Sequence, residues 1–147
     1  FTIAHSITLA LATLHIIRVP ASFTEAAIAL SIVFLGVEIL NHYKGKDGFA
    51  YHYPWMVSFL FGLLHGLGFA SALQDTGLPE NNIPLALFLF NAGVEAGQLI
   101  FVFVMLLLMA VIRQLKFRFP EWIFKAPAYL IGTLAMYWFM ERLVLIF

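Results

Sequence analysis

Residues 83–112 read IPLALFLFNAGVEAGQLIFVFVMLLLMAVI, and Glu95 is the one ionisable side chain among them. A helix needs about 20 predominantly apolar residues to cross the hydrocarbon core of a bilayer, so this stretch is more than long enough. At about 1.5 Å per residue it would extend about 45 Å. We therefore expect a membrane-spanning helix that tilts, projects beyond the bilayer, or bends near Gly93 and Gly97.

The rest of the chain has the same character. Of its 147 residues, 63% are hydrophobic and 11% are charged, whereas soluble domains have about 45–50% and about 25%. The formal net charge is zero, so the composition indicates no nucleic-acid partner. There is no cysteine, which excludes disulfides and thiolate metal ligands. The composition predicts an all-α bundle that is embedded in a lipid bilayer.

Further apolar stretches extend this prediction to a multi-pass protein with about five spans. The chain opens on Phe1 and runs at once into an apolar stretch, so we expect the first span to be clipped and the chain to begin within a longer protein. We expect a single transmembrane domain over residues 1–147, with spans at about 1–17, 21–40, 54–73, 83–112 and 126–146.

Basic residues in the loops predict the orientation of these spans. One set of loops contains most of the lysines and arginines, and the opposite set contains only Arg18. Cytoplasmic loops of membrane proteins are enriched in such residues. We therefore place in the cytoplasm the two loops that hold Lys44, Lys46, Arg113, Lys116, Arg118 and Lys125.

Several strongly polar side chains lie within the predicted spans, where their cost usually marks a site or a pathway. His5 belongs to the first span, and His65 lies among glycines in the third. In the fourth span, Asn91 and Glu95 are four residues apart and share one helix face. A purely structural explanation stays open: each imidazole could be satisfied by a neighbouring polar group, and Glu95 could be protonated in an interhelical hydrogen bond.

Depth in the membrane supports a common site. At about 1.5 Å per residue, His5 is about 18 Å from the predicted outer surface, His65 about 12 Å, and Glu95 about 17 Å. Asn91 is about 10 Å deep by the same count. Two imidazoles, a carboxylate and an amide predict a site for a divalent metal ion, and this chemistry leaves nickel, cobalt, zinc and iron open.

Other polar residues are expected to line the pathway or to support the ligands. Glu25 lies near the outer mouth and Glu38 near the cytoplasmic end, although Glu38 could instead simply extend to the membrane surface. The complete set comprises Ser6, Glu25, Ser31, Glu38 and Gln98.

Four segments of the chain together resemble the HupE/UreJ family of bacterial membrane proteins. They are FTIAHSITLA (1–10), EAAIALSIV (25–33), FGLLHGLGFA (61–70) and FNAGVEAGQ (90–98). His5, His65, Asn91 and Glu95 match the family's motifs, whereas His42 and His52 do not and are expected in interfacial loops.

The resemblance implies a multi-pass protein of the bacterial inner membrane that carries nickel or cobalt. It also implies metalloenzyme maturation proteins as partners, because the family is associated with hydrogenase and urease maturation. Family members usually carry an upstream helix with the pattern G-x-x-H-I-x-x-G-x-D-H, which these residues lack. We therefore expect part of the site to lie upstream.

Three functions are compatible with these residues. The favoured one is transport of a divalent metal ion past the site formed by His5, His65, Asn91 and Glu95. An intramembrane metal-dependent hydrolase, with Glu95 as general base, is an alternative. A non-transporting accessory protein that hands metal to a partner is another. No nucleophile elbow, phosphate loop or organic-cofactor motif is present, so we predict no catalytic residue.

Overall fold

The structure is a computed structural model that describes residues 1–75, 82–114 and 120–146, without the side chains of Gln74, Asp75 and Glu121. The described ranges contain helices and no strand, which confirms the predicted all-α fold. The helices are α1 (Thr2–Thr13), α2 (Ala21–Tyr43), α3 (Phe49–His52), α4 (Pro54–Asp75), α5 (Ile83–Gln114) and α6 (Glu121–Val144).

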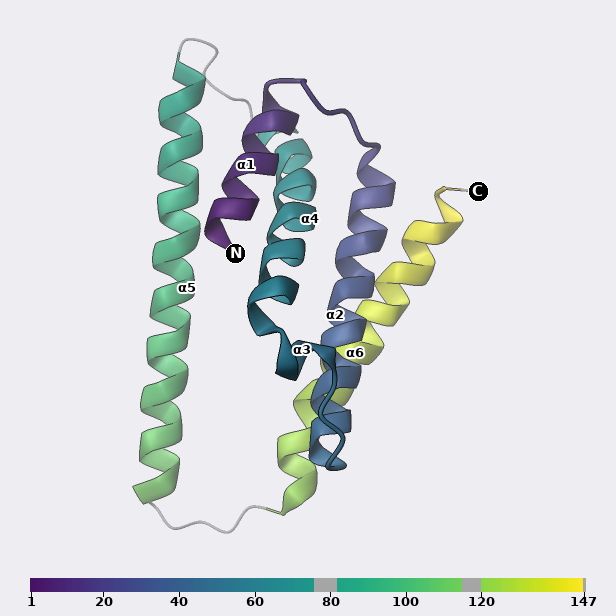
Figure 1. The fold of residues 1–147 in the computed structure, drawn as a ribbon, viewed down its shortest axis with the longest axis vertical. Helices are drawn as coiled ribbons and strands as arrows, with labels where there is room; N and C mark the ends of the chain where they lie inside the picture. Colours follow the sequence, from purple (N-terminus) through teal and green to yellow (C-terminus); the bar gives the residue numbers. More distant parts are fainter. Residues whose placement is uncertain (76–81, 115–119, 147) are drawn as a thin grey trace.

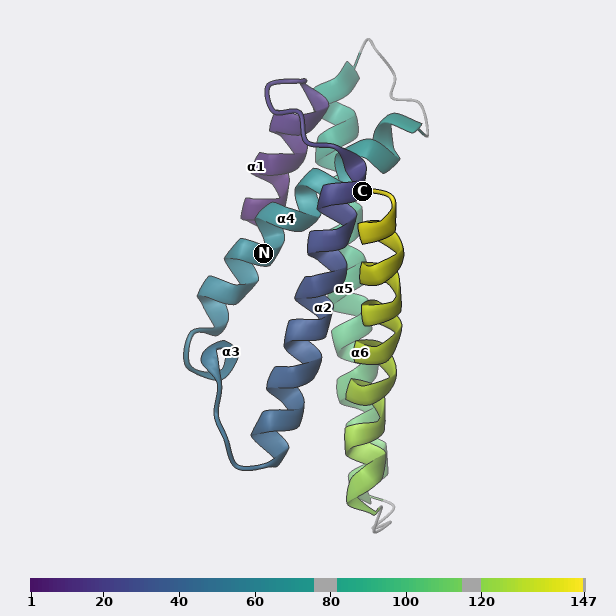
Figure 2. The same cartoon turned by 90° about the vertical axis from the view of Figure 1, so that its right-hand side faces the viewer.

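The five longer helices lie side by side in the order α5, α1, α4, α2 and α6 (Figure 1). The spatial order differs from the chain order because α4 packs between α1 and α2. Seen from the side, α6 runs along α2 over most of its length (Figure 2). The polar residues of α1, α2, α4 and α5 are therefore carried by four adjacent helices of this layer.

Three of these helices are long and apolar enough to cross a membrane: Ala21–Tyr43, Pro54–Leu73 and Ile83–Gln114. The count of about five spans stays a prediction. The first helix ends at Thr13 rather than near residue 17, and its 12 residues extend only about 18 Å. It ends because His15 adopts a left-handed φ of 58°, which a continuing helix does not allow. The last helix begins at Glu121, before the predicted residue 126.

Helices α1 and α4 approach closely at two glycines of α4. A Cβ atom at Gly62 would lie 2.6 Å from the carbonyl oxygen of Phe1. A Cβ atom at Gly66 would collide with the carbonyl oxygen of His5 and with the hydroxyl of Thr8. Small residues four positions apart commonly allow such contacts between membrane helices. This close contact places the backbone of α1 against the face of α4 that Gly62 and Gly66 form, with His65 between them in the sequence.

Helices α2 and α6 make the second extensive contact. At Gly36 of α2, a Cβ atom would lie 3.3 Å from the carbonyl oxygen of Ala128. Near the other end of the pair, Glu25 and Arg142 form an ion pair of 2.9 Å between Oε2 and Nε. Lys125 lies over the ring of Tyr43, 5.9 Å from its centroid, so the start of α6 lies beside the end of α2.

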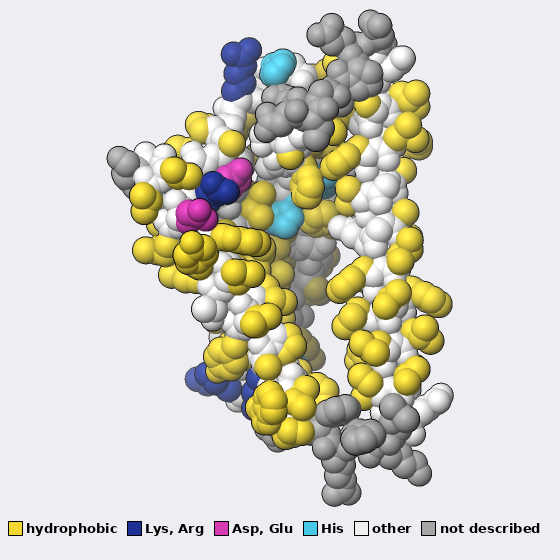
Figure 3. Space-filling view, turned by 180° about the vertical axis from the view of Figure 1, so that it is seen from behind, with side chains coloured by type: hydrophobic (Ala, Val, Ile, Leu, Met, Phe, Trp, Pro, Cys, Tyr) yellow, Lys and Arg dark blue, Asp and Glu magenta, His cyan; other side chains and the backbone are white. Residues whose placement is uncertain are grey.

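Helix α5 is packed along only part of its length. Leu87 joins Leu9 and Ala70 in a buried cluster, and Phe90 contacts Phe69. Every residue from 95 to 111 is exposed. From Leu99 to Val111 the exposed side chains of α5 are hydrophobic, and a gap separates this part of the helix from the other helices (Figure 3). A helix that is apolar on all sides is typical of one that contacts lipid.

The structure describes the first of the two predicted basic loops and the two ends of the second. The end of α2, which precedes Lys44 and Lys46, and the end of α5 lie at the same end of the molecule (Figure 1). Lys116 and Arg118 lie outside the described residues. The cytoplasmic orientation of this end stays a prediction.

Candidate metal-binding site

His5 is buried at the contact between α1 and α5. Its side chain is only 1% exposed, and its Nδ1 lies 3.0 Å from the Oδ1 of Asn91. The amide of Asn91 is fixed in turn, because its Nδ2 donates a 2.9 Å hydrogen bond to the carbonyl oxygen of Leu87 in the preceding turn. The predicted meeting of a first-span imidazole with a fourth-span amide is therefore present.

Aromatic rings enclose the imidazole of His5. Phe1 stacks on it at 5.6 Å between centroids and Phe90 at 6.5 Å, while Phe69 contributes an edge contact at 5.5 Å. These rings restrict the orientation of the imidazole.

The other ring nitrogen of His5, Nε2, has no hydrogen-bond partner within the described parts of the chain. Among the described residues, His5 Nε2 and Thr13 Oγ1 are buried side-chain polar atoms without a hydrogen bond. Buried polar atoms are almost always paired, so an unpaired one calls for an explanation. In His5 the unpaired atom is a nitrogen of the type that binds transition metals.

His65 is held at the neighbouring contact between α2 and α4. Its Nε2 lies 3.4 Å from the hydroxyl oxygen of Ser31, which is the residue expected beside the pathway. The Ser31 hydroxyl itself donates a 2.6 Å hydrogen bond to the carbonyl oxygen of Ile28. Phe61 stacks on the His65 ring, and Phe1 makes an edge contact at 5.7 Å. The ring of Phe1 thus touches both histidines.

Glu95 and Gln98 do not join the histidines. Both are exposed on α5 beyond the contact with α1. Glu95 shares a face with Asn91 and lies one helical turn further along. Ser6 donates to the carbonyl oxygen of Thr2 within its own helix. Within the described parts of the chain, no three or more His, Asp or Glu side chains are close enough together to hold a metal ion.

The two remaining carboxylates have structural partners. Glu25 pairs with Arg142, as described above. Glu38 accepts a 2.7 Å hydrogen bond from the backbone N–H of Ala50, at the start of the short helix α3. A side chain at Gly48 would collide with the Glu38 carboxylate. Both carboxylates therefore hold neighbouring segments of the fold together.

Sequence reasoning missed the aromatic enclosure and Arg142. The available signals were Phe1 four residues before His5, Phe69 four residues after His65, and Phe90 next to Asn91. Large apolar side chains are so common in this chain that such spacing does not distinguish a site from ordinary packing. His42, expected at an interface, pairs with Asp47 in an exposed position at the end of α2.

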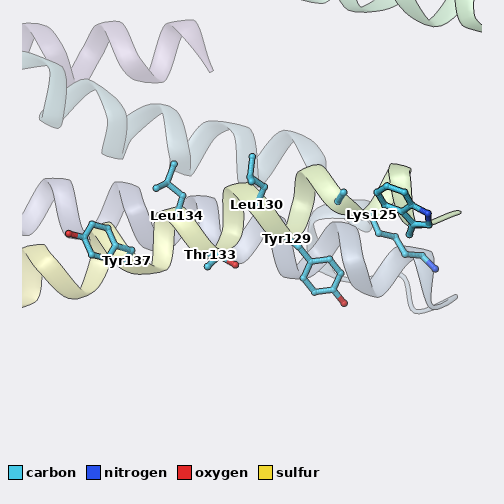
Figure 4. Close-up of a pocket in the computed structure, with 8 residues that line it drawn as sticks. Lys125, Tyr129, Leu130, Thr133, Leu134 and Tyr137 are labelled. Atoms are coloured by element: carbon cyan, nitrogen blue, oxygen red, sulfur yellow. The ribbon is translucent and has the colours of Figure 1, made fainter. Parts of the chain in front are cut away.

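A large hollow of the described surface lies elsewhere. It has a volume of about 840 Å³ and follows one face of α6, where Tyr129, Thr133 and Tyr137 point outward (Figure 4). All of its lining residues belong to this single helix. Such a mostly apolar face with tyrosines is typical of a helix that contacts lipid and its headgroups.

These features define a helical membrane protein with two histidines held in its interior by an amide, a hydroxyl and aromatic rings. A model of the HupE/UreJ protein family matches residues 1–142, nearly the whole chain. The chain belongs to this family, which is associated with nickel or cobalt uptake or with an accessory function. Comparisons with curated proteins and with solved structures found no match.

Proposed function

We propose that this protein conducts a divalent transition metal ion, nickel or cobalt, across the bacterial inner membrane. The observation that carries the proposal is the buried Nε2 of His5, which has no hydrogen-bond partner among the described residues. The choice of nickel or cobalt is supported by membership of the HupE/UreJ family, which is associated with uptake of these metals or with an accessory function. The ion is the cargo of the protein rather than a resident cofactor.

The chemistry of the histidine pair suits transient binding. Neutral imidazole binds nickel and cobalt well, and it does so without adding a charge to the membrane interior. Conduction requires a site that binds strongly enough for the ion to enter and weakly enough for it to leave. His5 and His65, which both contact Phe1, would provide two nitrogen ligands, with water completing the coordination.

The exposed carboxylate of α5 provides the next step of the proposed path. Glu95 has no partner among the described residues and lies one turn beyond Asn91. An ion that leaves His5 and His65 would meet Glu95 and then Gln98 along the same helix. Release on the cytoplasmic side would supply nickel to metalloenzyme maturation proteins.

Metal uptake by cells tests the proposal. The complete protein is expressed in a host that lacks its own nickel uptake, and accumulation of radioactive nickel is measured. We expect the double variant H5A/H65A to lose at least about nine-tenths of the uptake, since even the loss of a residue that supports a metal ligand typically costs about 10- to 100-fold. His42→Ala, which removes an exposed histidine at the end of α2, is the control. Uptake by H5A/H65A at the native rate, with equal amounts of protein in the membrane, would exclude the proposal.

A further inference from the structure

We infer that the polar neighbours of the two histidines fix them in opposite neutral tautomers, so that His5 presents Nε2 and His65 presents Nδ1. In this arrangement Asn91 and Ser31 are positioning residues rather than metal ligands. The tautomers follow from the hydrogen bonds alone. Their consequence for metal binding rests on the proposed function.

For His5, the assignment starts from the amide of Asn91. The NH₂ group of Asn91 is occupied by the carbonyl oxygen of Leu87, so its oxygen is the atom that faces the imidazole. An amide oxygen can only accept a hydrogen bond. Nδ1 of His5 must therefore carry the proton, and in the neutral ring Nε2 keeps its lone pair. This is the buried nitrogen that lacks a hydrogen-bond partner among the residues that the structure describes.

For His65, the assignment starts from the hydroxyl of Ser31. A hydroxyl has one proton, and Ser31 donates it to the carbonyl oxygen of Ile28 at 2.6 Å. Towards His65 the Ser31 oxygen can only accept. Nε2 of His65 must then carry the proton. In the neutral ring, Nδ1 keeps the lone pair.

This arrangement corresponds to the usual support of metal-binding histidines. One nitrogen of such a ring donates to a fixed acceptor, which sets the tautomer and the direction of the other nitrogen. The stacked rings of Phe1 and Phe90 hold the plane of His5 in addition. Its depth in the membrane predicts Asn91 as a metal ligand. In the structure both ends of its amide are engaged, so Asn91 acts through His5.

The tautomers are measured by nitrogen NMR on the complete protein, labelled with ¹⁵N in its histidine rings and reconstituted in lipid nanodiscs without metal. The pH is kept about two units above the ordinary histidine pKa so that the rings are neutral. Signals are assigned by removing each histidine in turn. We expect the proton on Nδ1 in His5 and on Nε2 in His65. The reverse tautomer at either ring overturns the inference for that ring.

Two variants and their matched controls test the cause. Asn91→Leu should release His5 into a mixture of tautomers, and Asn91→Asp, which retains an acceptor oxygen, should restore the proton to Nδ1. Gln98→Leu removes an amide further along α5 and should leave the His5 tautomer unchanged. Ser31→Ala should release His65, whereas Ser71→Ala, which removes a hydroxyl that donates to the carbonyl oxygen of Gly68 in its own helix, should not. An unchanged His5 tautomer in Asn91→Leu would contradict the role of Asn91.

Metal binding separates this inference from the proposed function. Nickel affinity, measured by titration of the reconstituted protein, should fall about 10- to 100-fold in Asn91→Leu and recover in Asn91→Asp. If NMR finds the expected tautomers but H5A/H65A takes up nickel at the native rate, the transport function is rejected. The tautomer assignment then still holds. An Asn91→Leu variant with altered tautomers and native affinity would show that Asn91 does not act on metal.

Discussion

Helices α4 and α5 look alike in sequence, yet the structure uses them differently. Each is an apolar span that includes a pair of glycines four residues apart and has one ionisable residue near its middle. Gly62 and Gly66 of α4 lie against the backbone of α1, whereas a Cβ atom at Gly93 or Gly97 of α5 would meet nothing within 4 Å. His65 of α4 has a polar partner in Ser31, whereas Glu95 of α5 is exposed and has none among the described residues.

The comparison shows that a motif of small residues permits a close contact but does not create one. Apolar side chains gain little from leaving lipid, so helix association in a membrane depends on the fit of particular surfaces. Helix α1 supplies the fitting surface for α4. It covers only the first part of α5, through residues such as Leu9 and His5.

The largest difference between the two regions should appear on removal of a leucine side chain. Leu9→Ala would leave a cavity where α1, α4 and α5 meet, since Leu9 is 0% exposed, and should lower the free energy of unfolding by about 2–5 kcal/mol. Leu106→Ala removes a side chain of α5 that is 59% exposed and should cost less than about 0.5 kcal/mol. Detergent-driven unfolding in mixed micelles measures both. Equal losses would show that α5 is packed as tightly as α1.

The glycines provide the next largest difference. Gly66→Ala places a methyl group against the carbonyl oxygen of His5 and should destabilise the protein by about 1–3 kcal/mol. Gly97→Ala meets nothing and should leave stability within about 1 kcal/mol of the native value, on the favourable side because alanine is the better helix former. The same unfolding assay applies. A destabilising Gly97→Ala would reveal a contact of α5 with another molecule.

Replacing the ionisable residue of each helix should change the free energy of unfolding by amounts that differ less. His65→Leu removes the contact with Ser31 and should cost about 0.5–1.5 kcal/mol of unfolding free energy, the usual contribution of a hydrogen bond. Glu95→Leu breaks no hydrogen bond within the described residues and should not lower stability. A loss in Glu95→Leu as large as that in His65→Leu would mean that Glu95 has a partner.

The smallest effect is expected at the ion pair that joins α2 and α6. Glu25 and Arg142 are 41% and 38% exposed, so solvent and salt weaken their attraction. Arg142→Gln should lower the unfolding free energy by about 0.2–1 kcal/mol, and the loss should shrink in high salt. A larger, salt-independent loss would show that the pair is shielded from solvent and belongs with the tightly packed region around α1.

Part of the site was predictable because the cost of polar atoms in lipid singles out a few residues. His5, His65, Asn91 and Ser31 were each found in this way, and the structure places them in two hydrogen-bonded pairs. The pairing itself was not predictable. Helical periodicity gives the face of each residue on its own helix, whereas the choice of partner depends on which helices are neighbours.

The amino-acid sequence by itself determined that this protein is an all-α membrane protein, because so apolar a chain can satisfy its backbone groups in lipid only as helices or a closed barrel and its apolar stretches are of helix length. It also determined the family. Only the tertiary structure decided that His5 meets Asn91, that His65 meets Ser31, and that Glu95 stays apart. Those outcomes depend on α1 fitting against the glycines of α4 and on α5 touching α1 only near its start.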